Sequence, residues 1–151
     1  MDMRPDYDDE YPTCVETYAT LRIFSDALTP GEITEAVGRE PTDDFRKGEL
    51  RTGVPKAKNP HHQTNGWFYS TRGQSKSRDC RRHLDLLIAA VLGNPDVLAQ
   101  LRKRGCTMDA SIFYVYTQGG PTISPRQMRA LAEAGIDVWW DLYRDQSDED
   151  H

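Results

Sequence analysis

Apolar and polar residues alternate over two segments, residues 15–24 and 136–143, and this period of two is typical of β-strands. In the first segment we expect Val15, Thr17, Ala19, Leu21 and Ile23 to face the core, and Glu16, Tyr18, Thr20, Arg22 and Phe24 to face outward. In the second we expect Ile136, Val138, Trp140 and Leu142 to face inward, and Asp137, Trp139, Asp141 and Tyr143 outward. Both predicted strands therefore carry aromatic rings on the face away from the core.

Three further segments are predicted to be strands. Residues 107–117 contain a run of aromatic and β-branched residues, which favour extended backbone. Residues 67–70 form a shorter candidate. The stretch 39–65 has few apolar residues and several Pro and Gly, so we expect only one short strand there, at residues 49–52, followed by a flexible loop.

Two predicted helices share the same start and stop signals. Each has Ser or Thr as N-cap, then Pro, with Glu or Gln three residues after the cap, and each ends at Gly. The two sets are Thr29, Pro30, Glu32 and Gly38, and Ser124, Pro125, Gln127 and Gly135. Their expected buried stripes are Ile33, Ala36 and Val37 in the first helix, and Met128, Leu131 and Ala132 in the second.

Two more helices lie between them. The longer opens near Ser77 and runs to Leu92, because apolar residues recur there at helical spacing. Its stripe is Cys80, Leu84, Leu87, Ile88 and Val91. The next helix has Asn94 as its cap and Pro95 at its first position, and Gly105 ends it.

The order of elements predicts an α+β fold. We expect a mainly antiparallel sheet of four to five strands with the helices on one face, in the ferredoxin-like manner. The repeated strand, loop and Pro-containing capping box also fits a degenerate internal duplication, with chance recurrence of a common cap as the alternative.

Length and charge predict one domain between two tails. The chain has 151 residues, the size of one folding unit, and we expect a domain over residues 15–143 with acidic flexible tails at residues 1–14 and 144–151. Residues 46–82 instead carry ten basic residues against two acidic ones. The net charge of −5 argues against general nucleic-acid binding, since acidic tails repel phosphate. We favour the interpretation that the tails and the basic segment neutralise each other.

The lack of a membrane-spanning or leader segment and the spacing of the cysteines predict the cellular compartment and the state of the thiols. The sequence has no apolar run long enough to cross a membrane and no apolar N-terminal leader, so we expect a soluble protein in the cytoplasm. Cys14, Cys80 and Cys106 are odd in number and widely spaced, which indicates free thiols.

The segment 71–77 joins a predicted strand to a helix and combines Gly, Ser and Lys. Backbone N–H groups at a helix start can hold a phosphate or sulfate, although the full phosphate-loop pattern is missing. The anion-binding candidates are Arg72, Lys76 and Arg78, with Lys47 as a further one. The alternative is a solvent-exposed connector in which Ser77 only caps the helix.

The outward faces of the first and last strands form a second candidate site. Its residues are Tyr18, Arg22, Phe24, Trp139 and Tyr143. A sheet face with this many rings is covered by something or binds something. The candidates are the chain's own loop 39–65, a second copy in a homodimer, or a partner protein. Nucleic acid comes last, because Glu16, Asp137 and Asp141 share this face.

Metal and enzyme chemistry have little support. Cys80 and His83 lie three residues apart on a helix, with His61 and His62 in the preceding loop, but this is no known zinc spacing and Cys80 continues an apolar stripe. We expect no metal and no cofactor. The sequence contains none of the common catalytic motifs, so whether the protein is an enzyme stays open.

A set of short motifs resembles a bacterial family known as domain of unknown function 4279. The motifs are Leu21-Arg22-Ile23, Thr29-Pro30-Gly31-Glu32-Ile33-Thr34, Pro41-Thr42, Lys47-Gly48, Gly66-Trp67, the Leu-rich helix after His83, Ile123-Ser124-Pro125, and Ile136-Asp137-Val138-Trp139-Trp140-Asp141-Leu142-Tyr143. The resemblance spans residues 15–143 and implies a bacterial origin and a compact α+β domain. It implies no activity. The longer and more basic loop 55–65 departs from it.

From these patterns we expect a non-enzymatic protein-interaction module, regulatory or immunity-like by analogy, that binds another protein or itself. The alternative is a small-anion or nucleotide-binding protein, with or without catalytic activity, that uses the basic loop 72–78.

Overall fold

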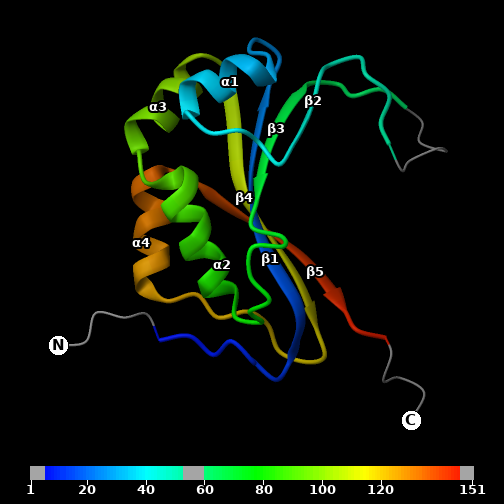
Figure 1. Ribbon diagram of the computed structural model, residues 1–151, viewed down its shortest axis with the longest axis vertical. Coiled ribbons are helices and arrows are strands. Elements are labelled where there is room, and N and C mark those ends of the chain that lie inside the picture. The colour runs from blue at the N-terminus through cyan, green and yellow to red at the C-terminus, as the bar shows by residue number, and fades with distance from the viewer. Residues whose placement is uncertain (1–5, 53–59, 147–151) are drawn as a thin grey trace.

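The computed structural model describes residues 6–52 and 60–146, and they form one mixed five-stranded sheet with helices on one side (Figure 1). In spatial order the strands are β2 (Asp43–Phe45), β3 (Asn65–Ser70), β1 (Cys14–Ser25), β4 (Cys106–Tyr116) and β5 (Asp137–Arg144). Neighbouring strands are antiparallel except β4 and β5, which are parallel. The α+β class and the mainly antiparallel sheet are confirmed, whereas the ferredoxin-like arrangement and the internal duplication are not.

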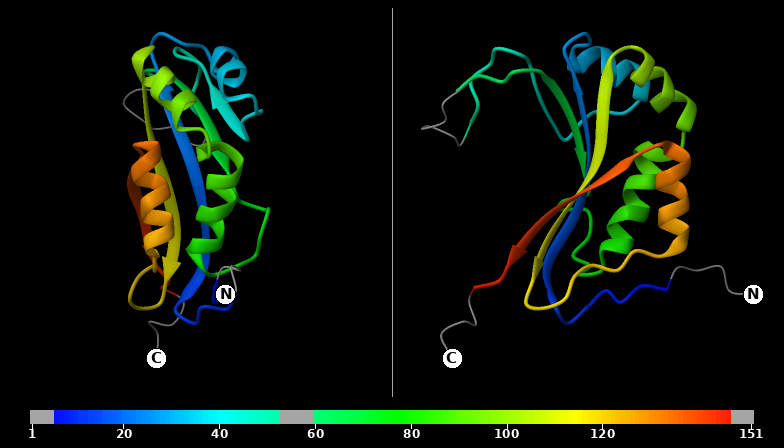
Figure 2. Two further views of the ribbon diagram at one scale, coloured as in Figure 1. Left: turned by 90° about the vertical axis from the view of Figure 1, so that its left-hand side faces the viewer. Right: turned by 180° about the vertical axis from the view of Figure 1, so that it is seen from behind.

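The helices cover one face of this sheet and leave the other face open (Figure 2). They are α1 (Pro30–Val37), α2 (Cys80–Leu87) with its π-helical continuation η1 (Ile88–Leu92), α3 (Pro95–Lys103) and α4 (Pro125–Ala134). α4 joins β4 to β5, as a parallel strand pair requires a crossover connection. All helices expected from the sequence are present.

The predicted caps are confirmed at α1, α3 and α4. Thr29 and Ser124 both form capping boxes, and Asn94 accepts a hydrogen bond from the backbone N–H of Val97. Gly38 and Gly135 end α1 and α4 with φ of 79° and 68°, in the left-handed region that glycine adopts without strain.

The start of α2 differs from the prediction. The helix begins at Cys80 with Asp79 as its N-cap, and the Asp79 side chain accepts a hydrogen bond from the backbone N–H of Arg81. Ser77 donates its hydroxyl hydrogen to Asp9 instead. The Ser77 hydroxyl oxygen accepts the backbone N–H of Asp79, so Ser77 stabilises the N-cap residue rather than capping the helix itself.

The core lies between the helices and the covered face of the sheet. Its fully buried side chains include Leu21, Ile23, Ile33, Trp67, Leu84, Leu87, Leu98, Leu101, Ile112 and Tyr114. The indole N–H of Trp67 donates to Thr34 Oγ1 at 2.9 Å, so the largest core side chain also ties β3 to α1. These residues come from β1, β3, β4 and the helices.

Three expected core positions, Val15, Met128 and Ala132, are wrong because of local geometry. A bulge near the start of β1 shifts the register between Cys14 and Glu16, so Val15 is exposed and Cys14 is buried. In α4 the buried face is Gln127, Leu131 and Ala134 rather than the face with Met128 and Ala132.

The strand expected at residues 49–52 is also wrong. Leu50 forms only an isolated bridge with His61 and is exposed. The edge strand is β2, which contains two aspartates and has no local strand signal. Its pairing with β3, in which Asp43 lies opposite Phe68, determines its conformation.

The inward set of the last strand is only half correct. Ile136 is buried and Val138 half-buried, but Trp140 and Leu142 are 41% and 48% exposed. β5 is an edge strand and runs away from α4 past the end of the helical layer (Figure 1). Among the described residues, no helix therefore covers its second half.

Candidate functional site

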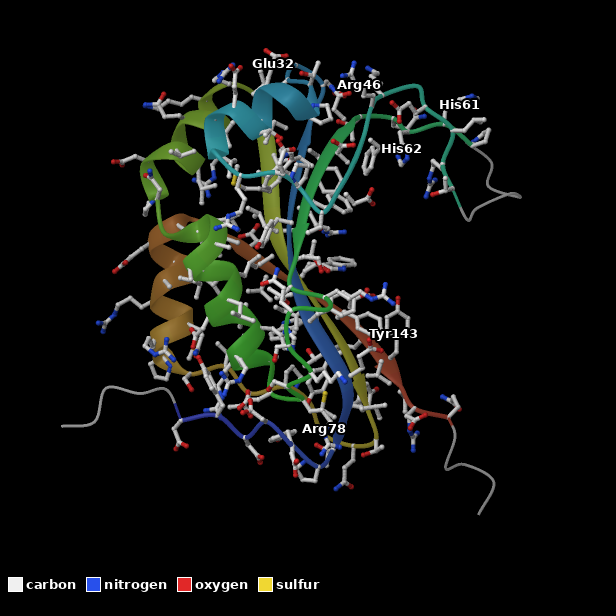
Figure 3. All side chains as sticks on the ribbon, in the orientation of Figure 1. Glu32, Arg46, His61, His62, Arg78 and Tyr143 are labelled. Carbon is white, nitrogen blue, oxygen red and sulfur yellow. The ribbon has the colours of Figure 1, made fainter. Side chains whose placement is uncertain are left out.

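The open face of the sheet carries all five residues predicted for the interaction site. Their neighbours along β1, namely Ala19, Leu21 and Ile23, are buried on the helical side, so Tyr18, Arg22 and Phe24 point the other way. The register carries this face to β5 through cross-strand neighbours, which share a face. Figure 3 shows Tyr143 on the side of the sheet opposite the helices.

Three further rings complete this surface, which we call the ring face. Its aromatic members are Tyr18, Phe24, Phe45, Phe68, Phe113, Trp139 and Tyr143. Tyr18 stacks on Phe113 with ring centroids 4.6 Å apart, and Phe113 lies 5.4 Å from Tyr143. Phe68 packs edge-on against Phe24 and Phe45, each at 5.5 Å.

Sequence reasoning missed Phe45, Phe68 and Phe113. Alternation within residues 107–117 could have found Phe113, because it is two residues from Ser111 and opposite in phase to the buried Ile112 and Tyr114. Phe45 carries no such signal. Its ring reaches the face only because β2 pairs with β3 and places Phe45 opposite Gly66.

An ion pair lies between the two groups of rings. Arg22 donates from Nε and Nη2 to the two carboxylate oxygens of Asp109, at 2.8 and 2.7 Å. Its Cζ atom is 5.6 Å from the ring centroids of both Phe24 and Trp139. The two side chains are 25% and 23% exposed. The bidentate geometry and the flanking rings hold this guanidinium in place, and Asp109 compensates its charge.

The remaining charges on the strands of the ring face are acidic, and Arg72 of the loop 71–77 adds a cation beside Tyr18. Glu16, Asp43, Asp137 and Asp141 belong to the ring face through the same strand register. A hydrogen bond to Asp141 raises the pKa of the Tyr143 hydroxyl, which keeps that group a donor. The face is thus aromatic and negatively charged.

One hollow of the ring face lies at the end of β5 nearest the helices. It has a volume of about 360 Å³ and is lined by Phe24, Thr107, Met108, Asp109, Asp137, Val138 and Trp139. Because Asp109 is already paired with Arg22, the two rings and the Asp137 carboxylate are the groups suited to a cationic ligand, which gains both charge attraction and contact with the π face of a ring.

A second hollow brings together three of the four anion-binding candidates. It has a volume of about 360 Å³ and is formed by residues 15–18 of β1 and by the loop with Arg72, Lys76 and Arg78. The Arg72 Cζ atom lies 5.4 Å from the Tyr18 ring centroid. Lys47 does not join them, because it pairs with Asp26 at 3.8 Å beyond the opposite end of β1.

The acidic segment before β1 lies against the basic start of α2. Arg82 donates to both carboxylate oxygens of Asp9, at 2.6 and 2.7 Å, and Ser77 donates to Asp9 at 2.6 Å. The Arg82 hydrogen bonds lower the pKa of Asp9 to about 2. Arg78 donates to the Glu10 carbonyl, and Figure 3 shows it beside this segment.

These contacts match the neutralisation that we favoured from the sequence, for the N-terminal side. The contacts come from Asp9 and Glu10, which belong to the predicted flexible tail. Residues 1–5, the basic residues Lys56 and Lys58, and residues 147–151 lie outside the described chain.

The Cys/His cluster considered for a metal is occupied by other contacts. Both ring nitrogens of the buried His83 are used, at 2.9 Å from Thr71 Oγ1 and 3.0 Å from the Ser77 carbonyl oxygen. The Cys80 thiol donates to the Thr122 carbonyl, and burial raises its pKa to about 12. Cys14, Cys80 and Cys106 are buried free thiols. Within residues 6–52 and 60–146, no three His, Cys, Asp or Glu side chains are grouped to hold a metal.

The helices of this domain are short. Across the described residues no single helix has the length and apolar composition to cross a membrane, and only the bent pair Cys80–Leu92 and Pro95–Lys103 has them when its two parts are joined across a 67° angle.

The fold and the ring face define an open-faced α+β domain with a mixed five-stranded sheet. The chain belongs to the DUF4279 family, a domain of unknown function, whose sequence profile matches residues 15–145. This confirms the resemblance seen in the sequence motifs. No curated protein and no solved structure shows significant similarity to the chain.

Proposed function

We propose that this domain is a non-enzymatic protein-interaction module, regulatory or immunity-like in role, whose ring face binds a partner protein through the partner's Lys and Arg side chains. The observation that supports it is the combination of seven rings with four carboxylates, Glu16, Asp43, Asp137 and Asp141, on a sheet face that the helices do not cover.

Each component favours a protein ligand of this kind. Exposed aromatic side chains provide large contact area at low conformational cost and are enriched at protein interfaces. The carboxylates select against polyanions and attract cations. Arg22 and Asp109 compensate each other, so they add order to the face without changing its sign.

The test uses two peptides of equal length with alternating apolar and charged residues, one with Arg and one with Glu, labelled for fluorescence polarisation. We expect the Arg peptide to bind and the Glu peptide not to bind, with affinity falling as salt rises. The double variant Asp137→Lys/Asp141→Lys should weaken binding about tenfold or more, equivalent to about 1.4 kcal/mol.

Glu35→Lys/Glu133→Lys, two exposed changes on the helical side in α1 and α4, adds the same four units of charge, so it is the matched control for net charge and should leave the affinity unchanged. Equal binding of both peptides, or equal losses in the ring-face and control variants, would refute the proposal.

A second candidate, binding of a small anion or nucleotide, is supported by the hollow with Arg72, Lys76 and Arg78. A ligand at 100 times its dissociation constant should add about 2.7 kcal/mol of stability. Thermal shifts with phosphate, sulfate and nucleotides test this, with Lys76→Ala as the site variant and Lys103→Ala as control. Absence of any shift would eliminate the candidate.

A further inference from the structure

The two edges of the sheet differ strongly. β2 ends the sheet on one side with three residues, two of them aspartates, whereas β5 ends it on the other with eight. β5 pairs with β4 from Asp137 to Arg144, and no other strand of the described chain pairs with its outer edge. A strand edge presents unpaired backbone N–H and C=O groups, so a long bare edge is a template for another strand.

β5 is also the most apolar exposed element of the described chain. The described chain has seven exposed large hydrophobic residues. Four of them lie on β5: Trp139 (53%), Trp140 (41%), Leu142 (48%) and Tyr143 (51%). They occur on both faces of the strand, since alternate residues point to opposite sides. A strand laid along this edge would contact apolar side chains above and below the sheet.

We propose that this strand is β5 of a second copy of the chain, paired antiparallel about a two-fold axis through Trp140. Such an axis stands perpendicular to the sheet, so residues paired across it point to the same face. The axis therefore passes through a residue that lies opposite its own equivalent in the second copy, which we call the centre of the register. The three centres that use most of the strand are Trp139, Trp140 and Asp141.

Charge selects among these three centres. With the axis at Trp139, Asp137 lies opposite Asp141 of the second copy, and with the axis at Asp141 that carboxylate lies opposite itself. Like charges directly opposite each other destabilise a strand pair. With the axis at Trp140, no two carboxylates are opposite.

The register centred on Trp140 also pairs the apolar residues. Val138 lies opposite Leu142 of the second copy, and Trp140 opposite its own equivalent, so six apolar side chains meet on the helical side. On the ring face, Trp139 lies opposite Asp141 of the second copy and Asp137 opposite Tyr143. The pattern along β5 is therefore complementary to itself, which supports a second copy as the occupant.

The assembly joins two five-stranded sheets into one and places the two ring faces side by side. It uses the strand edge rather than the ring face, so it does not depend on the function proposed above. Salt separates the two. Each chain carries a net charge of −5, so screening should strengthen self-association, whereas it weakens binding of a basic peptide.

The register can be tested by disulfide trapping in the full chain. Residues directly opposite in an antiparallel pair have Cβ atoms about 4.5–5.5 Å apart, close enough for an oxidised Cys pair after small adjustments. We expect Trp140→Cys to form a covalent dimer on oxidation. Val138→Cys and Leu142→Cys should cross-link when mixed, but neither should cross-link alone.

Two proteins serve as negative controls for the cross-linking. Met128→Cys, exposed on α4, and the wild-type chain with its three buried thiols should stay uncrosslinked. Trp140→Lys should give a monomer by light scattering with an unchanged circular dichroism spectrum. A wild-type chain that is monomeric at all concentrations, or preferential trapping of Trp139→Cys or Asp141→Cys over both Trp140→Cys and the mixed pair, would overturn the proposal.

Discussion

The Nδ1 atom of His83 lies 2.9 Å from Oγ1 of Thr71 in the interior of the protein, and the same Oγ1 accepts a hydrogen bond from the backbone N–H of Ala19 at 3.0 Å. His83 also reaches the Ser77 carbonyl oxygen through Nε2. One buried side chain thus connects β1, α2 and both ends of the basic loop, and this loop lines the hollow beside Tyr18.

This connection predicts an acid-sensitive stability. Burial lowers the pKa of His83 below its ordinary value of 6.5, so the unfolded chain binds a proton that the folded chain does not. The free energy of unfolding should therefore fall as the pH drops below about 6.5. Urea denaturation at pH 7.5 and 5.5 measures it, and His83→Gln should reduce the difference. An equal pH dependence in both proteins would contradict the prediction.

Asp9 should contribute a second, more acidic dependence. Its pKa is lowered from 3.8 to about 2 by Arg82 and Ser77, so its stabilisation is complete above pH 3.8 and disappears as the pH falls toward 2. At pH 7, Asp9→Asn should cost about 0.5–1 kcal/mol, because the pair is bidentate but partly exposed.

Thermal denaturation of Asp9→Asn, compared with Glu35→Gln on the exposed side of α1, isolates this pair. The control should match the wild-type chain throughout. A loss in Asp9→Asn that persists unchanged at pH 2 would show that the carboxylate charge is not its cause.

Gly66 should be intolerant of a side chain because the Phe45 ring covers it. A methyl group at Gly66 would overlap that ring. Gly66→Ala should therefore destabilise the protein by about 1–3 kcal/mol and displace the ring. A double-mutant cycle with Phe45→Ala tests the cause, since the double variant should cost less than the sum of the two single changes.

Gly120→Ala is the matched control, because no atom lies within 4 Å of its added methyl group. We expect less than about 0.5 kcal/mol there. Strict additivity of Gly66→Ala and Phe45→Ala would mean that the ring does not cause the cost.

Arg22 should resist replacement even by lysine. Lysine keeps the charge but loses the two-bond contact with Asp109 and the stacking beside Trp139. We expect Arg22→Lys to cost about 1 kcal/mol, with coupling to Asp109→Asn in a double-mutant cycle and a change in tryptophan emission. Arg129→Lys on α4 should be neutral. A neutral Arg22→Lys would show that charge alone stabilises this pair.

Local signals in the sequence were sufficient for the elements that stabilise themselves locally. The capping boxes at Thr29 and Ser124 satisfy backbone groups within one turn, so short-range chemistry determines where α1 and α4 begin. Alternation along β1 likewise placed Tyr18, Arg22 and Phe24 on one face. The family resemblance followed from motifs at these same places and was confirmed over residues 15–145.

Other features depended on partners far away in the chain. β2 has no strand signal and exists because β3 pairs with it, and Phe45 reaches the ring face by that pairing. Lys47 and Arg72 both belong to the basic segment, yet they lie near opposite ends of β1. The Ser77 hydroxyl donates to Asp9, a contact across 68 residues of sequence that no local pattern indicates.

The sequence by itself determined the ends of α1 and α4, the central strands and the ring-bearing side of the sheet, because capping and alternation act between residues a few positions apart. Only the tertiary structure decided that β5 is a bare edge with Trp140 and Leu142 exposed. Its alternation is the same as that of a covered strand. Exposure is a property of where the helical layer ends, and that is set by the packing of the whole chain.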